Sequence, residues 1–170
     1  MNQEFTTRTT CPACESEAIL HWTHGEIPYL GEVMYLTSEC QCGHRYTDVL
    51  ALREKEPLRY EFHIESQSDL DVRVIRSSTG RIELPELGII IDPGTASESF
   101  ISNIEGLLKR VEKILQIFLQ DEEKRERAKE LLNQIDEIYK NGNLTVIIED
   151  PTGNSAILSK NAKKIPLTSE

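Results

Sequence analysis

The chain has 170 residues, of which 38% are hydrophobic and 28% charged, a composition typical of a globular protein. Acidic residues outnumber basic ones by 29 to 19, and the net charge is -10. Because duplex nucleic acid is held mainly by lysine and arginine side chains, this charge argues against a general nucleic-acid binder and favours a protein partner. The longest apolar run, LGIII at 87–91, is too short to span a bilayer, so no membrane association is expected.

All four cysteines lie near the N-terminus, and their distribution predicts a metal site. Residues 1–10, MNQEFTTRTT, lack the apolar stretch of a secretory signal, so we expect a cytoplasmic protein, in which disulfides are rare. The cysteines form two close pairs between positions 11 and 42. This pattern favours one bound Zn²⁺ ion over a redox or merely structural role for the thiols.

The stretch between the two cysteine pairs predicts a β-hairpin. AILHWTHGEIPYL is interrupted by Gly25 and Pro28, and EVMYLTSE supplies β-favouring residues for the return strand. Two cysteine-bearing turns at the ends of a hairpin would form a zinc ribbon, here within residues 1–55. Such a module is too small to fold on a hydrophobic core, so metal binding would supply its folding energy, about 10–16 kcal/mol in peptide models.

The two pairs differ in spacing. Cys11 and Cys14 have the two intervening residues that let both sulfurs face one ion, whereas Cys40 and Cys42 have only one. Residues i and i+2 of a strand share a face, so both could still reach the metal if the turn begins at Cys42, where Gly43 favours a tight turn.

Histidines near the cysteines are the alternative ligands. His44 could replace Cys40 as the fourth ligand, and the sequence leaves this choice open. His21 and His24 are three residues apart in an expected strand, so they would face opposite sides and cannot both join one site. His63 alternates out of a strand and is expected to face solvent.

Residues 56–160 predict a β domain with an inserted helical hairpin. Strands are expected at LRYEFHIE, at LDVRVIR from Leu70, and within RIELPELGIIIDPG, where Pro85 indicates an edge or a bend. Apolar residues then recur with helical spacing through two amphipathic stretches at about 103–141, ended by NGN. A final strand follows at LTVIIED, and residues 161–170 are expected to form a partly ordered tail.

The sequence offers no positive sign of an enzyme. It contains neither a phosphate-binding GxxxxGK[ST] loop nor a GxSxG nucleophile elbow, and no pair of carboxylates stands out by its spacing. A zinc ion held by four cysteines has no open position for water or substrate, so the site is predicted to be structural. We therefore predict a binding protein without catalytic activity.

Six stretches, in this order, resemble the ZPR-one zinc-finger protein family over nearly the whole chain. They are CPAC at 11–14, IPYLGEVMYL at 27–36, CGHRYTDV at 42–49, DLDVRVIRSSTGRIELPELGIIIDPGT at 69–95, SNIEGLL at 102–108 and IIEDPTGNSAI at 147–157. Eukaryotic members carry two copies of the finger-plus-β-domain unit. This chain has room for one, and so resembles the archaeal form.

The resemblance implies a fold, a ligand set and a partner. The fold would be α+β and mainly β: a finger similar to that of the initiation-factor-two β subunit, then a double-stranded β-helix-like domain bearing a helical hairpin. The ligand role is carried to Cys11, Cys14 and Cys42, and to Cys40 although it is shifted by one position. The implied partner is translation elongation factor one-alpha, which eukaryotic relatives bind and help to fold. A zinc ribbon that binds RNA or the ribosome is the alternative function.

Overall fold

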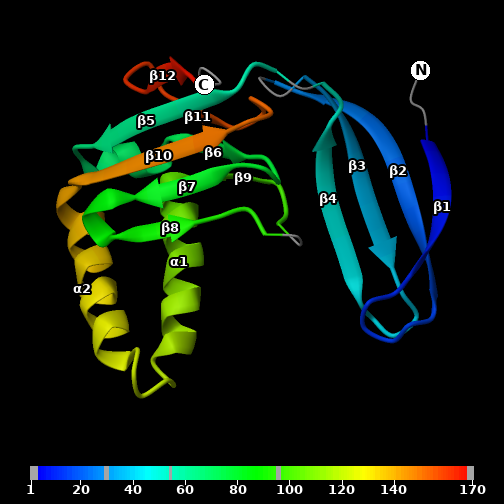
Figure 1. The fold of residues 1–170 in the computed structure, drawn as a ribbon, viewed down its shortest axis with the longest axis horizontal. Helices are drawn as coiled ribbons and strands as arrows, with labels where there is room; N and C mark the ends of the chain where they lie inside the picture. The colour runs from blue at the N-terminus through cyan, green and yellow to red at the C-terminus, as the bar shows by residue number, and fades with distance from the viewer. Residues whose placement is uncertain (1–3, 29–30, 54, 95–96, 168–170) are drawn as a thin grey trace.

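The chain folds into an N-terminal finger and a larger β domain with two helices (Figure 1). The computed structural model describes residues 4–28, 31–53, 55–94 and 97–167. Strands predominate in both parts, and the two helices follow one another as a hairpin. This confirms the predicted α+β, mainly β architecture.

The finger is a single antiparallel sheet of four strands in the order β1-β2-β3-β4. The predicted hairpin is its centre, formed by β2 and β3. Neither outer strand was predicted from the sequence. The outer strand β1 gave no signal, because its described residues are polar or exposed throughout and show no alternation. It is held by pairing with β2, from Glu4 opposite Thr23 to Thr10 opposite Glu17. The strands are β1 (Glu4–Thr10), β2 (Glu17–Ile27), β3 (Gly31–Glu39) and β4 (Arg45–Ala51).

The β domain has two sheets, one with the strand order β12-β5-β10-β7-β8 and one with the order β11-β6-β9. Strand β10 lies in the middle of the larger sheet and pairs with β5 on one side and β7 on the other. The chain therefore returns to the centre of the sheet after the helices. The strands are β5 (Leu58–Ile64), β6 (Arg73–Arg76), β7 (Arg81–Leu84), β8 (Ile89–Ile91), β9 (Phe100–Asn103), β10 (Leu144–Asp150), β11 (Ala156–Leu158) and β12 (Lys163–Pro166).

Three stretches of the β domain differ from their sequence predictions. Leu70 lies in a short 3₁₀ turn before β6, because the Asp69 carboxylate accepts the backbone N–H groups of Glu65 and Ser66 and tightens the chain there. A second 3₁₀ turn begins at Pro85, which cannot donate a ladder hydrogen bond, and it separates β7 from β8. The expected tail contains β12, which pairs with β5.

The helical hairpin consists of α1 (Ile104–Phe118) and α2 (Arg125–Asn141), as the periodicity predicts. The Asn103 side chain caps α1 by accepting the Gly106 N–H at 2.8 Å. At the other end Gly142 terminates α2 with a φ of 74°, and a Cβ there would lie 2.7 Å from the Glu65 backbone, so only glycine fits. Neither helix is long and apolar enough to cross a membrane.

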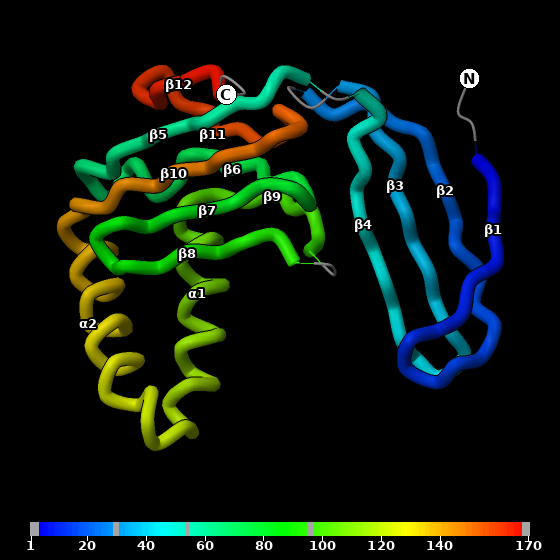
Figure 2. The backbone as a smooth tube through the Cα atoms, viewed as in Figure 1, coloured from blue at the N-terminus to red at the C-terminus, as the bar shows by residue number. Residues whose placement is uncertain are grey.

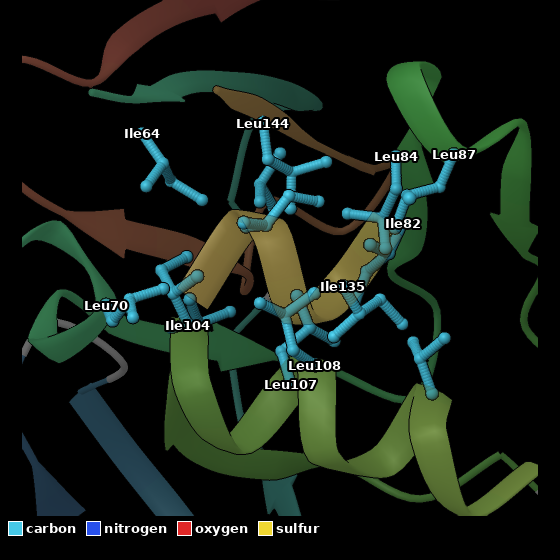
Figure 3. Packing of buried hydrophobic residues seen from close by; sticks show 14 of the residues in the cluster. Ile64, Leu70, Ile82, Leu84, Leu87, Ile104, Leu107, Leu108, Ile135 and Leu144 are labelled. Carbon is cyan, nitrogen blue, oxygen red and sulfur yellow. The ribbon is translucent and has the colours of Figure 1, made fainter. Parts of the chain in front are cut away.

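The core of the β domain lies between the helices and the sheets, where the inner faces of α1 and α2 meet strand residues (Figure 3). Helix propensity alone rarely holds a helix in water, so this buried face is what stabilises the hairpin. The buried cluster comprises Phe62, Ile64, Leu70, Val74, Ile82, Leu84, Leu87, Ile104, Leu107, Leu108, Val111, Leu115, Ala128, Leu131, Ile135, Ile138, Leu144, Val146, Ile148 and Ile157.

The finger packs against the β domain through one end of its sheet. Val33 on β3 is fully buried there against Ile75 of β6 and Ala156 of β11. The turns that join β1 to β2 and β3 to β4 lie together at the opposite end of the finger (Figure 2). These two turns carry the cysteines, so the metal-site candidate projects away from the domain junction.

Candidate metal centre

Four cysteine sulfurs meet at the free end of the finger. The Sγ atoms of Cys11, Cys14, Cys40 and Cys42 all lie within 4.8 Å of one another, with 3.7 Å between Cys11 and Cys42 and 3.5 Å between Cys14 and Cys40. Four thiolates around a tetrahedral Zn²⁺ at Zn–S distances of about 2.3 Å would be about 3.8 Å apart. The spacing of the sulfurs therefore fits a single tetrahedral ion.

The first cysteine turn is a four-residue loop between β1 and β2. The Cys11 N–H donates to the Ser16 carbonyl at 2.8 Å, and the Glu15 N–H donates back to the Cys11 carbonyl at 2.9 Å. Glu15 ends the loop in the left-handed region, with a φ of 59°. Cys11 is buried at the base of this loop, and Cys14 stands directly before the left-handed residue.

The second cysteine turn has the same design with one residue fewer. The Cys40 N–H donates to the His44 carbonyl and the Gly43 N–H to the Cys40 carbonyl, both at 2.9 Å, which leaves a three-residue loop. Gly43 takes the left-handed position with a φ of 88°, the standard ending of such a loop. The prediction that the turn begins at Cys42 is wrong: it begins at Cys40, and Cys42 lies inside it.

This shared design explains how the shorter spacing keeps both sulfurs in the cluster. In each turn one cysteine lies at the base of the loop and the other directly precedes the left-handed residue. Cys40 thus matches Cys11, and Cys42 matches Cys14. The missing residue shortens the loop between these two positions without removing either of them.

A serine that the sequence did not single out lies beside the sulfurs. The Ser16 Oγ is 2.9 Å from the Cys14 Sγ and 3.4 Å from the Cys40 Sγ. Its hydroxyl lowers the pKa of Cys14 and lowers the pKa of Cys40 to about 6. Its only sequence signal was its place directly after the first turn, where it could support a thiolate.

The close packing of the four sulfurs opposes the ionisation of all four thiols. The His44 backbone N–H lowers the pKa of Cys42, but the neighbouring Cys14 and Cys40 sulfurs outweigh it and raise that pKa to about 12. A divalent cation would remove this repulsion, because thiolates are the form in which cysteine binds metal. The donor set therefore fits a thiolate-binding metal ion.

The histidines lie outside the sulfur cluster. His44, the alternative fourth ligand, contributes its backbone carbonyl to the second turn, and its ring is not among the gathered ligand atoms. His24 lies 3.8 Å from a Glu32 carboxylate oxygen, while His21 is exposed on β2. His63 is exposed, as predicted, and its Nδ1 lies 3.1 Å from the Thr145 hydroxyl.

These features define a class of protein: a β-ribbon finger with a four-cysteine metal site, joined to a two-sheet β domain that carries a helical hairpin. The profile of the ZPR1 jelly-roll domain matches residues 68–168, which include β6 to β12 and both helices. The chain belongs to the ZPR1 family.

Relatives from archaea and eukaryotes support this assignment. An uncharacterised ZPR1-like protein of Pyrococcus horikoshii is 46% identical over 172 residues, a match that covers 94% of this chain and 76% of that protein. The human zinc finger protein ZPR1 is 31% identical over 165 residues, covering 91% of this chain but 36% of the human protein. The zinc finger chaperone zpr1 of Schizosaccharomyces pombe is 32% identical over 113 residues, covering 65% of this chain and 24% of that protein.

Proposed function

We propose that the protein is a zinc-binding adaptor or folding factor for a GTPase of the translation elongation factor one-alpha type. The observation that carries the proposal is the four-sulfur cluster at the free end of a finger that projects from the β domain. Relatives bear the names zinc finger protein and zinc finger chaperone, and the family resemblance supplies the elongation factor as the partner.

The metal in this proposal is one structural Zn²⁺ held by Cys11, Cys14, Cys40 and Cys42. Zinc prefers four-coordinate thiolate sites, and the spacing of the sulfurs agrees with its tetrahedral geometry. When bound, the ion would contribute folding free energy to the finger and would have no position left for a substrate. The proposed function is therefore binding, without catalysis at the metal.

The charges of the finger favour a protein partner over RNA. Between residues 4 and 53 it has three basic side chains, Arg8, Arg45 and Arg53, and each forms an ion pair with a glutamate. Nucleic-acid binding depends on basic side chains that neutralise phosphates. All three of these arginines are already paired with glutamates, so RNA is the weaker candidate ligand.

The proposal is tested by binding of the purified, zinc-loaded protein to the elongation factor of the same organism. We expect a complex by size-exclusion chromatography and calorimetry, and its loss when the zinc is chelated. A Leu52→Ser variant serves as the control, because Leu52 is exposed and lies beyond the cysteine turns. Absence of a complex with both zinc-loaded and chelated protein would overturn the proposal, as would salt-sensitive binding to ribosomal RNA alone.

A further inference from the structure

Two arginine side chains surround one aromatic ring in the β domain. Arg76 on β6 and Phe100 on β9 are directly opposite each other in the small sheet, and Arg110 reaches the same ring from α1. The guanidinium carbons of Arg76 and Arg110 lie 5.9 and 4.4 Å from the ring centroid. Both guanidinium groups are therefore within cation–π distance of the same ring.

The Arg76 residue is largely buried and has no carboxylate partner in the part of the chain that the structure describes. Arg76 is 7% exposed, yet it forms no ion pair with a carboxylate among the described residues. Its Nε donates to the Gly80 carbonyl at 2.8 Å, which accounts for one of its five N–H groups. Buried charges in proteins are normally paired, so this one invites an external anion.

Asp150, the acidic side chain whose charge acts on Arg76, already has its own hydrogen-bond donors. Asp150 influences Arg76 electrostatically, but its carboxylate accepts hydrogen bonds from the hydroxyls of Ser77, Thr79 and Ser155. Arg110 acts in the opposite sense: burial first, and then the Arg110 charge, lowers the pKa of Arg76. The two guanidinium groups therefore repel each other, and Asp150 does not relieve that repulsion by pairing.

Arg110 also lacks a counter-ion on its own helix. The positions three and four residues away on either side are Gly106, Leu107, Lys113 and Ile114, so no i,i+4 ion pair is possible. The nearby acidic residues of α1 are engaged elsewhere: Glu105 with Lys109, and Glu112 with the Tyr139 hydroxyl at 3.0 Å.

We propose that Arg76 and Arg110, held against Phe100, form a binding site for a phosphate group, either inorganic phosphate or a small phosphate monoester. Two guanidinium groups carry a charge of +2, which matches the charge of about -1.5 to -2 on a phosphate monoester at pH 7. A carboxylate would neutralise only half of it. Guanidinium groups also match the geometry of phosphate oxygens better than an ammonium does. This site is independent of the metal centre and of the proposed GTPase partner.

The test follows the arginine Nε–H signals by NMR while the full-length, metal-loaded protein is titrated at constant ionic strength. The probes are inorganic phosphate, glycerol 3-phosphate and acetate. We expect saturable shifts of the Arg76 and Arg110 signals with both phosphates and none with acetate. The tighter of the two phosphates identifies whether free phosphate or a monoester is the natural ligand.

Variants separate a specific site from general charge. Arg110→Gln is expected to weaken phosphate binding about tenfold, the effect of losing roughly 1.4 kcal/mol of charge-assisted hydrogen bonding. The control is Arg73→Gln, which removes the same charge from an exposed position on β6, the strand of Arg76, but on the opposite face. Arg76→Lys keeps the charge and is expected to bind less tightly than wild type, because the fork of donors is lost.

Three results would overturn the proposal. The first is binding of acetate as tightly as phosphate, because the site would then not select phosphate over a carboxylate. The second is an equal loss of affinity in Arg73→Gln and Arg110→Gln, which would indicate a diffuse charge effect. The third is the absence of any saturable shift in wild type at millimolar phosphate.

Discussion

The free end of the finger and the β domain are stabilised in different ways. The β domain buries twenty apolar side chains in one cluster, whereas the cluster at the free end of the finger consists of Cys11, Ala18 and Cys40. Two of those three residues carry sulfurs of the candidate metal site. The β domain thus has a hydrophobic core of its own, and the finger end has the four-sulfur cluster in place of one.

Removal of the metal is expected to have the largest effect, and the effect should be confined to the free end of the finger. Chelation should disorder the two cysteine turns, because metal binding contributes about 10–16 kcal/mol in peptide models and no apolar core replaces it. The end of the finger packed through Val33, and the whole β domain, should stay folded. Amide NMR spectra with and without chelator check this. Cooperative loss of the β-domain signals would contradict the contrast.

Substitution of one cysteine should act nearly as strongly. Cys40→Ser removes a buried sulfur from the cluster and should lower zinc affinity by more than the ten- to hundredfold cost typical of losing an outer-shell partner. His44→Ala is the matched control and should leave affinity unchanged, because its ring lies outside the cluster. Competition with a chromophoric chelator measures both. The reverse ranking would mean that His44 is the fourth ligand.

A substitution in the hydrophobic core should destabilise only the β domain. Leu108→Ala removes a fully buried side chain of α1 and should lower the free energy of unfolding of the β domain by about 2–5 kcal/mol. Zinc stoichiometry should not change. Ile117→Ala, on the same helix but 67% exposed, should cost less than about 0.5 kcal/mol. Chemical denaturation with parallel metal analysis gives both quantities, and a loss of zinc in Leu108→Ala would show that the two parts do not stabilise independently.

Acid should reveal a smaller contribution from Asp150 in the β domain. Burial raises the pKa of Asp150, but hydrogen bonds from the hydroxyls of Ser155, Ser77 and Thr79 outweigh it and lower the pKa to about 2. A depressed carboxyl pKa contributes stability above its unfolded value of 3.8, and this stability is lost as the pH falls toward 2. The contribution is about 2 kcal/mol by this linkage.

Comparison of wild type with Asp150→Asn isolates this effect from the acid loss of the metal. The variant should be less stable at pH 7, and the difference from wild type should shrink between pH 4 and pH 2. The measurement is denaturant unfolding of metal-free protein, followed by the signal of the β domain. A difference that does not change with pH would show that the Asp150 charge makes no contribution.

The sequence predicted the regular elements of the β domain well, because their periodicity reports burial directly. Leu58, Tyr60, Phe62 and Ile64 alternate on β5, and the helical spacing of α1 and α2 marks the faces that pack in the core. Strands β1, β4, β9 and β12 were not predicted. The residues of β1 and β12 are exposed, so pairing with a neighbouring strand, and not burial, holds these two strands in place.

The candidate metal site was predictable in its members but not in its geometry. Two pairs of cysteines identify the residues, yet a spacing of one residue does not reveal how both sulfurs are placed. The answer depends on backbone conformation, since Glu15 and Gly43 both end their loops in the left-handed region. A glycine in a sequence indicates that conformation, because glycine adopts it readily, but a glutamate does not. Ser16 escaped notice because its role depends on distances that only the fold sets.

The central position of β10 has a consequence for synthesis on the ribosome. The finger strands pair only with neighbours in sequence, so that sheet can form as soon as residue 51 has emerged. Strands β5 and β7 must wait for β10, whose register joins Ile64 to Leu144. Until then each exposes an unpaired edge of the kind that promotes aggregation. A nascent chain therefore completes its finger well before its jelly roll closes, and a chain stopped before residue 144 would carry a finished finger on an open sheet.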